Sequence, residues 1–139
     1  MIIIAFDFGV KNIGVAVGQK YTKTGTALNV ISAKNGKPNW NTIKNLLKDW
    51  DPKVAVVGLP LNMDGSRQNI TKESEKFARL LKNKFNILVE MHDERLTTIE
   101  AKTIIFNNSG TKKHNEKKIH ALSAVIILES WLNKDQIHI

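Results

Sequence analysis

An apolar run that ends in a carboxylate is the strongest constraint on how this chain folds. Residues 2–6 read Ile-Ile-Ile-Ala-Phe, and Asp7 follows them just before Gly9. The run predicts a buried central strand with Asp7 at its end. Because burying an unpaired charge is costly, such an aspartate needs a cation, an arginine or backbone N–H groups as its partner. Which partner Asp7 has is the main question that the sequence raises.

Alternating strand and helix signals follow this first run. Glycines between residues 9 and 14 predict a tight turn into a paired strand at 13–18, which forms a hairpin with the first. The later pattern predicts a strand at 27–33, a loop at 34–38, a helix at 40–50, a strand at 54–58, a turn-rich loop at 59–66, a helix around 77–81, a strand at 87–91, a helix opened by a capping box at 97–100, a mobile loop at 107–118 and a last helix at 119–132. This order predicts one α/β domain over residues 1–139, whose mixed sheet has an antiparallel hairpin and parallel crossovers.

The charge balance indicates a class of partner. The 21 Lys and Arg against 13 Asp and Glu give a net charge of +8, which favours a polyanion such as nucleic acid. A lysine-rich surface inherited from an A/T-biased genome explains the charge equally well. The chain has no cysteine, which excludes disulfides, thiolate metal sites and cysteine nucleophiles. It has no apolar stretch of membrane-spanning length and no signal peptide, so we expect a cytoplasmic protein without a membrane partner.

Two carboxylates stand at the predicted ends of strands. Asp7 ends the first strand and Glu94 lies just beyond the strand at 87–91, at the sheet edge where open α/β sheets bind ligands. Two converging oxygen ligands suit a hard divalent cation such as Mg²⁺ or Mn²⁺, which promotes phosphodiester hydrolysis. The residues alone leave another interpretation open, in which Asp7 caps the glycine turn and Glu94 pairs with Arg95 at the surface.

Four segments resemble the YqgF/RuvX family and occur in that family's order. They are residues 7–16, 56–66, 92–98 and 123–132, and the resemblance covers nearly the whole chain. It implies an RNase H-like fold related to RuvC resolvases. It also implies a metal-dependent nuclease that matures the 5′ end of pre-16S rRNA and leaves a 5′-phosphate and a 3′-hydroxyl. The partners implied are structured RNA and ribosomal precursor particles, or branched DNA, and we expect a monomer or a weak dimer.

The resemblance assigns roles residue by residue. Asp7 would be the first metal-binding carboxylate and Glu94 the second. Lys11 and Arg95 would contact phosphate or organise the site, with surface salt bridging as the alternative for each. The loop at 59–66 would shape the rim of the metal site, with a rigid turn needed for packing as its alternative.

The third position of the family's site differs in this chain. The family usually has an aspartate early in the last helix, and His120 stands there instead, after Lys118 and Ile119. A neutral imidazole suits Mn²⁺ or Zn²⁺ better than Mg²⁺. His120 could serve as a ligand or a general base, Glu116 could substitute one helical turn earlier, or the site could be weakened. We favour a working site that contains His120.

Three functions therefore compete. The first is a nuclease that acts on a ribosomal RNA precursor with Asp7, Glu94 and His120 as its metal-binding and catalytic residues. The second is a Holliday-junction resolvase, which would cut two DNA strands in concert as a dimer. The third is a catalytically weakened RNA- or ribosome-binding factor. Phosphate contacts carry no base information, so the sequence does not separate the first two.

Overall fold

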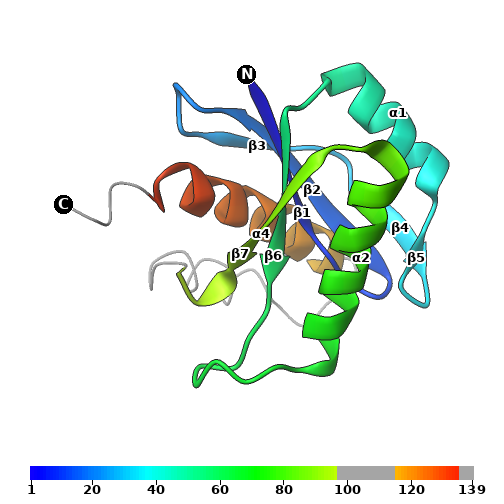
Figure 1. Cartoon of the computed structure of the whole chain (residues 1–139), viewed down its shortest axis with the longest axis vertical. Helices are drawn as coiled ribbons and strands as arrows, with labels where there is room; N and C mark the ends of the chain where they lie inside the picture. Colours follow the sequence, from blue (N-terminus) through cyan, green and yellow to red (C-terminus); the bar gives the residue numbers. More distant parts are fainter. Residues whose placement is uncertain (97–114, 135–139) are drawn as a thin grey trace.

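The computed structural model describes residues 1–96 and 115–134 (Figure 1). Strand β1 (Ile2–Asp7) pairs antiparallel with strand β2 (Asn12–Gln19), and Asp7 lies opposite Gly14. Residues 3–6 of β1 have no exposed surface because the strand lies inside the sheet. The predicted hairpin is therefore confirmed, and Asp7 ends a buried strand.

A mixed sheet continues on both sides of this hairpin. Its further elements in chain order are β3 (Gly25–Ala27), β4 (Ile31–Lys34), β5 (Lys37–Pro38), α1 (Trp40–Trp50), β6 (Val54–Leu59), α2 (Asn69–Phe85), β7 (Leu88–Asp93), the short 3₁₀ helix η1 (Glu94–Leu96) and α4 (Asn115–Leu132). The strand order is β5-β4-β2-β1-β6-β7, and β3 also pairs with β2. Strands β1, β6 and β7 run parallel, which confirms the predicted mixture of antiparallel and parallel pairing.

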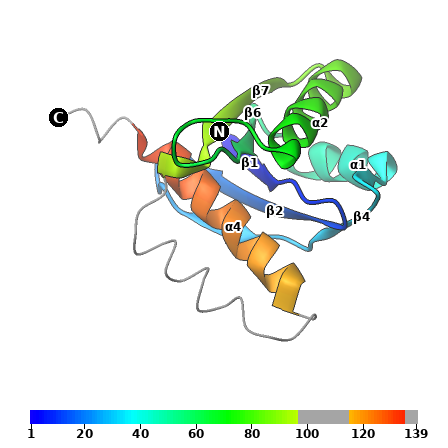
Figure 2. The same ribbon diagram turned by 90° about the horizontal axis from the view of Figure 1, so that it is seen from below.

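Helices cover both faces of the sheet (Figure 2). Helices α1 and α2 pack on one face over Ile4 and Phe6, with Phe77 of α2 in the same cluster, and α4 packs on the other over Ile3 and Ala5. Because side chains alternate along a strand, odd-numbered β1 residues face α4 and even-numbered ones face α1 and α2. Asp7 is thereby directed to the α4 side of the sheet.

Three of the predicted segments differ from the structure. The single strand expected at 27–33 is wrong: the chain forms β3 and β4 separately, because each pairs with a different part of β2. The loop expected at 34–38 contains a β4–β5 hairpin, whose turn residues Asn35 and Gly36 both have positive φ, as a type I′ turn requires. The mobile loop expected at 107–118 is wrong over residues 115–118, which belong to α4. The predicted capping box at 97–100 lies outside the described residues, as does most of that loop.

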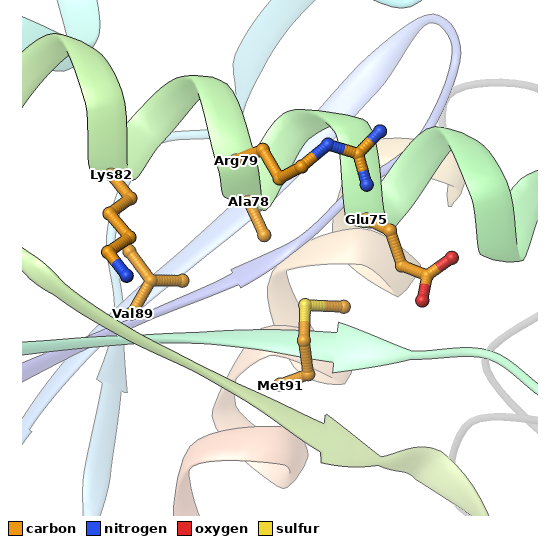
Figure 3. Close-up of a pocket in the computed structure, with 6 residues that line it drawn as sticks. All are labelled: Glu75, Ala78, Arg79, Lys82, Val89 and Met91. Atoms are coloured by element: carbon orange, nitrogen blue, oxygen red, sulfur yellow. The ribbon is translucent and has the colours of Figure 1, made fainter.

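A hollow of about 230 Å³ is lined by residues of α2 and β7 (Figure 3). Glu75, Arg79 and Lys82 reach it from α2, and Val89 and Met91 reach it from β7. Its base is therefore aliphatic and its rim is charged. The residues of the described chain that line it include no aromatic side chain.

Candidate functional site

The parallel strands bring the two predicted carboxylates to one edge of the sheet. Asp7 ends β1, Glu94 opens η1 directly after β7, and β6 lies between these strands. An added Cβ atom on Gly58 of β6 would lie only 3.0 Å from Glu94 Oε2. The Glu94 carboxylate therefore lies over β6, close to Gly58, and the charge of Asp7 acts on it there.

His120 reaches the same place from helix α4. Its Nδ1–H donates to Asp7 Oδ2 over 2.8 Å, with 28% of the histidine side chain and 13% of the aspartate side chain exposed. The ring packs against Gly9, where an added Cβ would lie 2.7 Å from His120 Cε1. The structure thus brings Asp7, Glu94 and His120 together, and one partner of Asp7 is this imidazole.

Electrostatics couple the three side chains. Burial raises the pKa of Asp7, and the hydrogen bond with His120 offsets part of that rise. Burial also raises the pKa of Glu94, from 4.5 to about 7, and the charges of Asp7 and Asp93 add to the effect. The hydrogen bond to Asp7 raises the pKa of His120 against the opposing effect of burial. A positive charge is therefore favoured at the point where these groups meet.

The donor set fits a divalent cation. Asp7 and Glu94 supply oxygen ligands and repel one another, and a bound cation would relieve that repulsion. Within residues 1–96 and 115–134, no three acidic or histidine side chains already stand in the arrangement of a metal site. The hydrogen bond from His120 occupies Asp7 Oδ2 in this state. A carboxylate has a second oxygen and further lone pairs, so Asp7 could still bind a cation, whereas His120 could bind one through Nδ1 only if this hydrogen bond broke.

Glu116 lies one helical turn before His120, inside α4. The helix therefore extends as far as the alternative ligand that the sequence suggested. Glu116 is exposed, and its charge contributes to the raised pKa of His120. Its contribution is electrostatic, whereas His120 contacts Asp7 directly.

Arg95 pairs with its neighbour Asp93. The Arg95 Nη2–Asp93 Oδ2 distance is 2.7 Å, and Nε and the backbone N–H of Arg95 also donate to this carboxylate. The surface pair of Glu94 with Arg95 that the sequence left open does not occur among the described residues. Arg95 also donates to the carbonyl oxygen of Met63 over 3.4 Å and lies 3.2 Å from a Cβ placed on Gly65. It therefore braces the loop at 59–66, and its predicted contact with phosphate stays a prediction.

Lys11 is exposed in the turn between β1 and β2. Its backbone carbonyl accepts a hydrogen bond from Ala33, which attaches the turn to β4. Lys11 lies in the turn that follows Asp7, and no ion pair joins it to another of the described residues. A phosphate contact by Lys11 also stays a prediction.

Two glycines with a role at the site were interpreted from the sequence only as turn residues. Gly14 of β2 lies beneath α4, where an added Cβ would be 1.9 Å from the backbone oxygen of His120. Gly9 makes room for the imidazole ring in the same way. The close glycine spacing was the only signal of this contact, and a hairpin turn explained that spacing equally well.

Stability should fall as pH rises through the range in which Glu94 ionises. The folded chain binds the Glu94 proton more tightly than the unfolded chain, so the carboxyl contributes stability below pH 4.5 that is lost by about pH 7. The expected loss is roughly 3 kcal/mol. Urea denaturation of the wild type and of Glu94→Gln, both without divalent metal, measures it: the difference in unfolding free energy should change across this range.

The difference between the wild type and Glu94→Gln is used because His92 also makes the stability depend on pH. Burial lowers its pKa, so its contribution changes with the opposite sign and is lost as pH falls below 6.5. His92 is present in both proteins, and its effect cancels in the difference. Parallel pH curves for the wild type and Glu94→Gln would contradict the coupling described here.

The chain resembles known proteins over nearly its whole length. Residues 1–134 match the RuvX family, which is described as Holliday junction resolvase. A protein of Buchnera aphidicola subsp. Schizaphis graminum named "Putative pre-16S rRNA nuclease" is 66% identical over 97% of this chain and 98% of its own. Proteins with the same name from Wigglesworthia glossinidia brevipalpis and Citrobacter koseri are 54% and 50% identical; each alignment covers 95% of this chain, and 92% and 96% of those proteins.

Solved structures confirm the fold. RuvC of T. thermophilus in complex with a Holliday junction substrate superposes with a TM-score of 0.59 at 13% identity, covering 99% of this chain and 96% of that one. The fowlpox virus Holliday junction resolvase gives 0.58 at 17% identity, covering 96% and 99%. These neighbours have the RNase H-like fold expected for the chain. None of the described helices is long and apolar enough to cross a membrane. From the family match and the close relatives, this chain belongs to the RuvX family.

Proposed function

We propose that this protein is a divalent-metal-dependent nuclease of the cytoplasm that hydrolyses phosphodiester bonds at the 5′ end of pre-16S rRNA within ribosomal precursor particles. The observation that carries the proposal is the pair of partly buried, mutually repelling carboxylates, Asp7 and Glu94, at the ends of parallel strands. The names of the close relatives support the RNA substrate, and the net charge of +8 suits it.

Each residue of the site has a role in this proposal. Asp7 and Glu94 would hold Mg²⁺ or Mn²⁺, and His120 would complete the ligand set or move a proton. Such an ion, when bound, supplies positive charge to phosphate oxygens and makes water more acidic. Glu94, with a pKa of about 7 before a cation binds, can release its proton near neutral pH. Lys11, exposed beside the site, would contact a phosphate of the substrate.

Cleavage of an RNA precursor tests the proposal. An end-labelled fragment that carries the leader before the 16S rRNA 5′ end is incubated with the full chain and Mn²⁺, Mg²⁺ or EDTA. We expect metal-dependent cleavage that leaves a 5′-phosphate, and little cleavage of a matched RNA that already begins at the mature 5′ end. An intact precursor with both metals would refute the proposal.

The family description and the solved resolvases favour a second candidate, a Holliday-junction resolvase. A four-way DNA junction added to the same assay separates the two. A resolvase would form a dimer, cut two opposing strands in concert and leave the RNA intact. We expect the RNA to be cut in preference to the junction, by a protein that sediments as a monomer or weak dimer.

Replacing His120 with aspartate should change the choice of metal. The substitution restores a third carboxylate beside Asp7, and hard oxygen donors favour Mg²⁺ more than an imidazole does. We expect the ratio of Mn²⁺-supported to Mg²⁺-supported cleavage to fall by roughly tenfold or more in His120→Asp. Cleavage rates at matched metal concentrations measure this ratio.

The same variant tests whether the natural chain is a binding factor. Cleavage that appears only in His120→Asp would mean that the wild type binds RNA without cutting it. Glu116→Gln is the matched control, because it removes a neighbouring charge from α4 without touching Asp7. It should leave the metal ratio close to that of the wild type.

A further inference from the structure

We propose that a hollow formed by α1, α2 and the β4–β5 hairpin binds one unstacked nucleotide of the RNA strand on which the protein acts. The hollow has a volume of about 320 Å³, at the lower end of the range of roughly 300–1,000 Å³ typical of small-molecule pockets. It lies on the face of the sheet opposite α4. The inference rests on the proposed function, since that function supplies the RNA.

An aromatic cluster forms the inside of the hollow. Phe8 and Phe77 are buried at its floor, with ring centroids 5.3 Å apart. The half-buried Trp40 forms a wall and stacks on Phe77, with centroids 5.7 Å apart and planes at 18°. These rings are fixed by packing with the core, so a base entering the hollow meets a preformed apolar surface. Stacking of a base on an aromatic side chain is worth about 1–3 kcal/mol.

Positive charge surrounds this aromatic cluster. Lys37, Lys76 and Lys84 line the hollow and are exposed, and Lys84 Nζ lies 5.2 Å from the centroid of the Trp40 ring. Glu73 is the one acidic side chain among the described residues that line it, and its carboxylate can accept from the amino group of a base. A nucleotide complements this arrangement, because its flat base can contact the aromatic rings while its phosphates contact the lysines.

The hollow and the candidate site share the end of β1. Phe8 lines the hollow, and the preceding residue, Asp7, is the buried carboxylate of the site. Their Cα atoms are about 3.8 Å apart, while their side chains lie on opposite faces of the sheet. A single strand that crosses this sheet edge could place one nucleotide in the hollow and a neighbouring phosphate at Asp7. The hollow would then help to set which phosphodiester bond is presented for cleavage.

Binding of a short oligoadenylate to the full chain tests the inference. EDTA is present throughout, so neither metal nor cleavage contributes. The indole N–H signals of Trp40, Trp50 and Trp131 are followed by NMR and assigned with single Trp→Phe variants. We expect the Trp40 signal to shift on titration, and the exposed Trp50 of α1, outside the hollow, to stay unchanged.

Matched lysine variants distinguish binding of RNA at the hollow from general electrostatic attraction of RNA to the protein. Lys76→Ala combined with Lys84→Ala should weaken binding by roughly tenfold or more, because it removes two charges from the rim. Lys44→Ala combined with Lys82→Ala removes the same charge from exposed positions of α1 and α2; Lys82 lines the separate hollow beside β7 (Figure 3). This control should bind within about twofold of the wild type. All four positions are exposed, so both proteins should fold.

Aromatic variants test the base itself. Trp40→Phe keeps a ring and should retain most of the affinity, whereas Trp40→Leu should lose roughly tenfold. An abasic RNA of the same length should bind the wild type about as weakly as the oligoadenylate binds Trp40→Leu. Adenosine monophosphate should bind much more weakly than the oligomer, since it lacks the phosphates that follow along the strand.

Several results would overturn the inference. They are a Trp40 signal that does not shift, an affinity for abasic RNA equal to that for the oligoadenylate, and an equal loss of affinity in both lysine double variants. Adenosine monophosphate that binds as tightly as the oligoadenylate is a further one. A polyglutamate peptide that moves the Trp40 signal as strongly as RNA would overturn it too. The cleavage assay reports separately on the proposed nuclease. If the protein cuts RNA but its Trp40 signal does not shift, only the proposal for the hollow is refuted. If the Trp40 signal shifts but the RNA is not cut, only the nuclease proposal is refuted.

Discussion

Asp7→Asn should lower the rate of RNA cleavage by roughly a thousandfold. Removal of a single preorganised charge-stabilising group from an active site already costs roughly 10²–10³ in rate. Asp7 is more central than such a group, because it is the buried carboxylate that would hold the cation and it also receives the hydrogen bond from His120. Single-turnover cleavage of the labelled precursor, with Mn²⁺ in excess, measures the loss.

The fold should survive this substitution. A buried carboxylate with a raised pKa is ionised at a cost near neutral pH, so a neutral amide should leave thermal stability equal or higher. The pKa of Glu94 should also fall below about 7, since the Asp7 charge contributes to its rise, and a carboxyl NMR titration measures that change. Asp49→Asn, at an exposed position of α1, is the matched control and should cleave like the wild type. Undiminished cleavage by Asp7→Asn would exclude the mechanism.

Gly14→Ala should destabilise the protein by about 3 kcal/mol or more and abolish cleavage with it. An alanine Cβ would lie 1.9 Å from the backbone oxygen of His120 and 2.4 Å from its carbonyl carbon. Both are backbone atoms, so no side chain can rotate to make room, and α4 must move away from the sheet. Overpacking of this kind costs about 1–3 kcal/mol and sometimes more. Urea denaturation at the pH of maximum stability measures the loss.

Gly25→Ala is the matched control for Gly14→Ala. Its added Cβ would meet Leu128 Cδ2 at 3.2 Å, and that atom belongs to a side chain of α4 rather than to its backbone. We expect a change of less than about 1 kcal/mol. Equal stability of the two variants would mean that α4 does not pack on β2 as closely as described.

Simple physical rules were enough to predict the sheet edge. The apolar run at 2–6 and the short run at 54–58 predict buried strands. The carboxyl ends of parallel strands lie at the same edge of a sheet. The convergence of Asp7 with Glu94 followed from that rule. The choice of a metal over a turn cap did not, and it came only from the resemblance to a family.

Contacts that depend on packing between distant segments could not be predicted. His120 was singled out by the family pattern, but its hydrogen bond to Asp7 depends on how α4 is rotated and how closely it approaches Gly14. The pairing of Arg95 with Asp93 depends on the 3₁₀ turn, which no pattern in the sequence predicted. The division of 27–33 into two strands also escaped detection, because neither glycine nor proline marks the break.

The hydrogen bond between His120 and Asp7 joins residues 113 positions apart. In a growing chain, Asp7 is therefore made 113 residues before its imidazole partner. Pairing of such distant segments is also slow to form during folding. For a protein proposed to cut ribosomal RNA precursors, this order would delay the assembly of the site until α4 has docked. Nascent chains, which are held beside ribosomal RNA, would then lack a complete site.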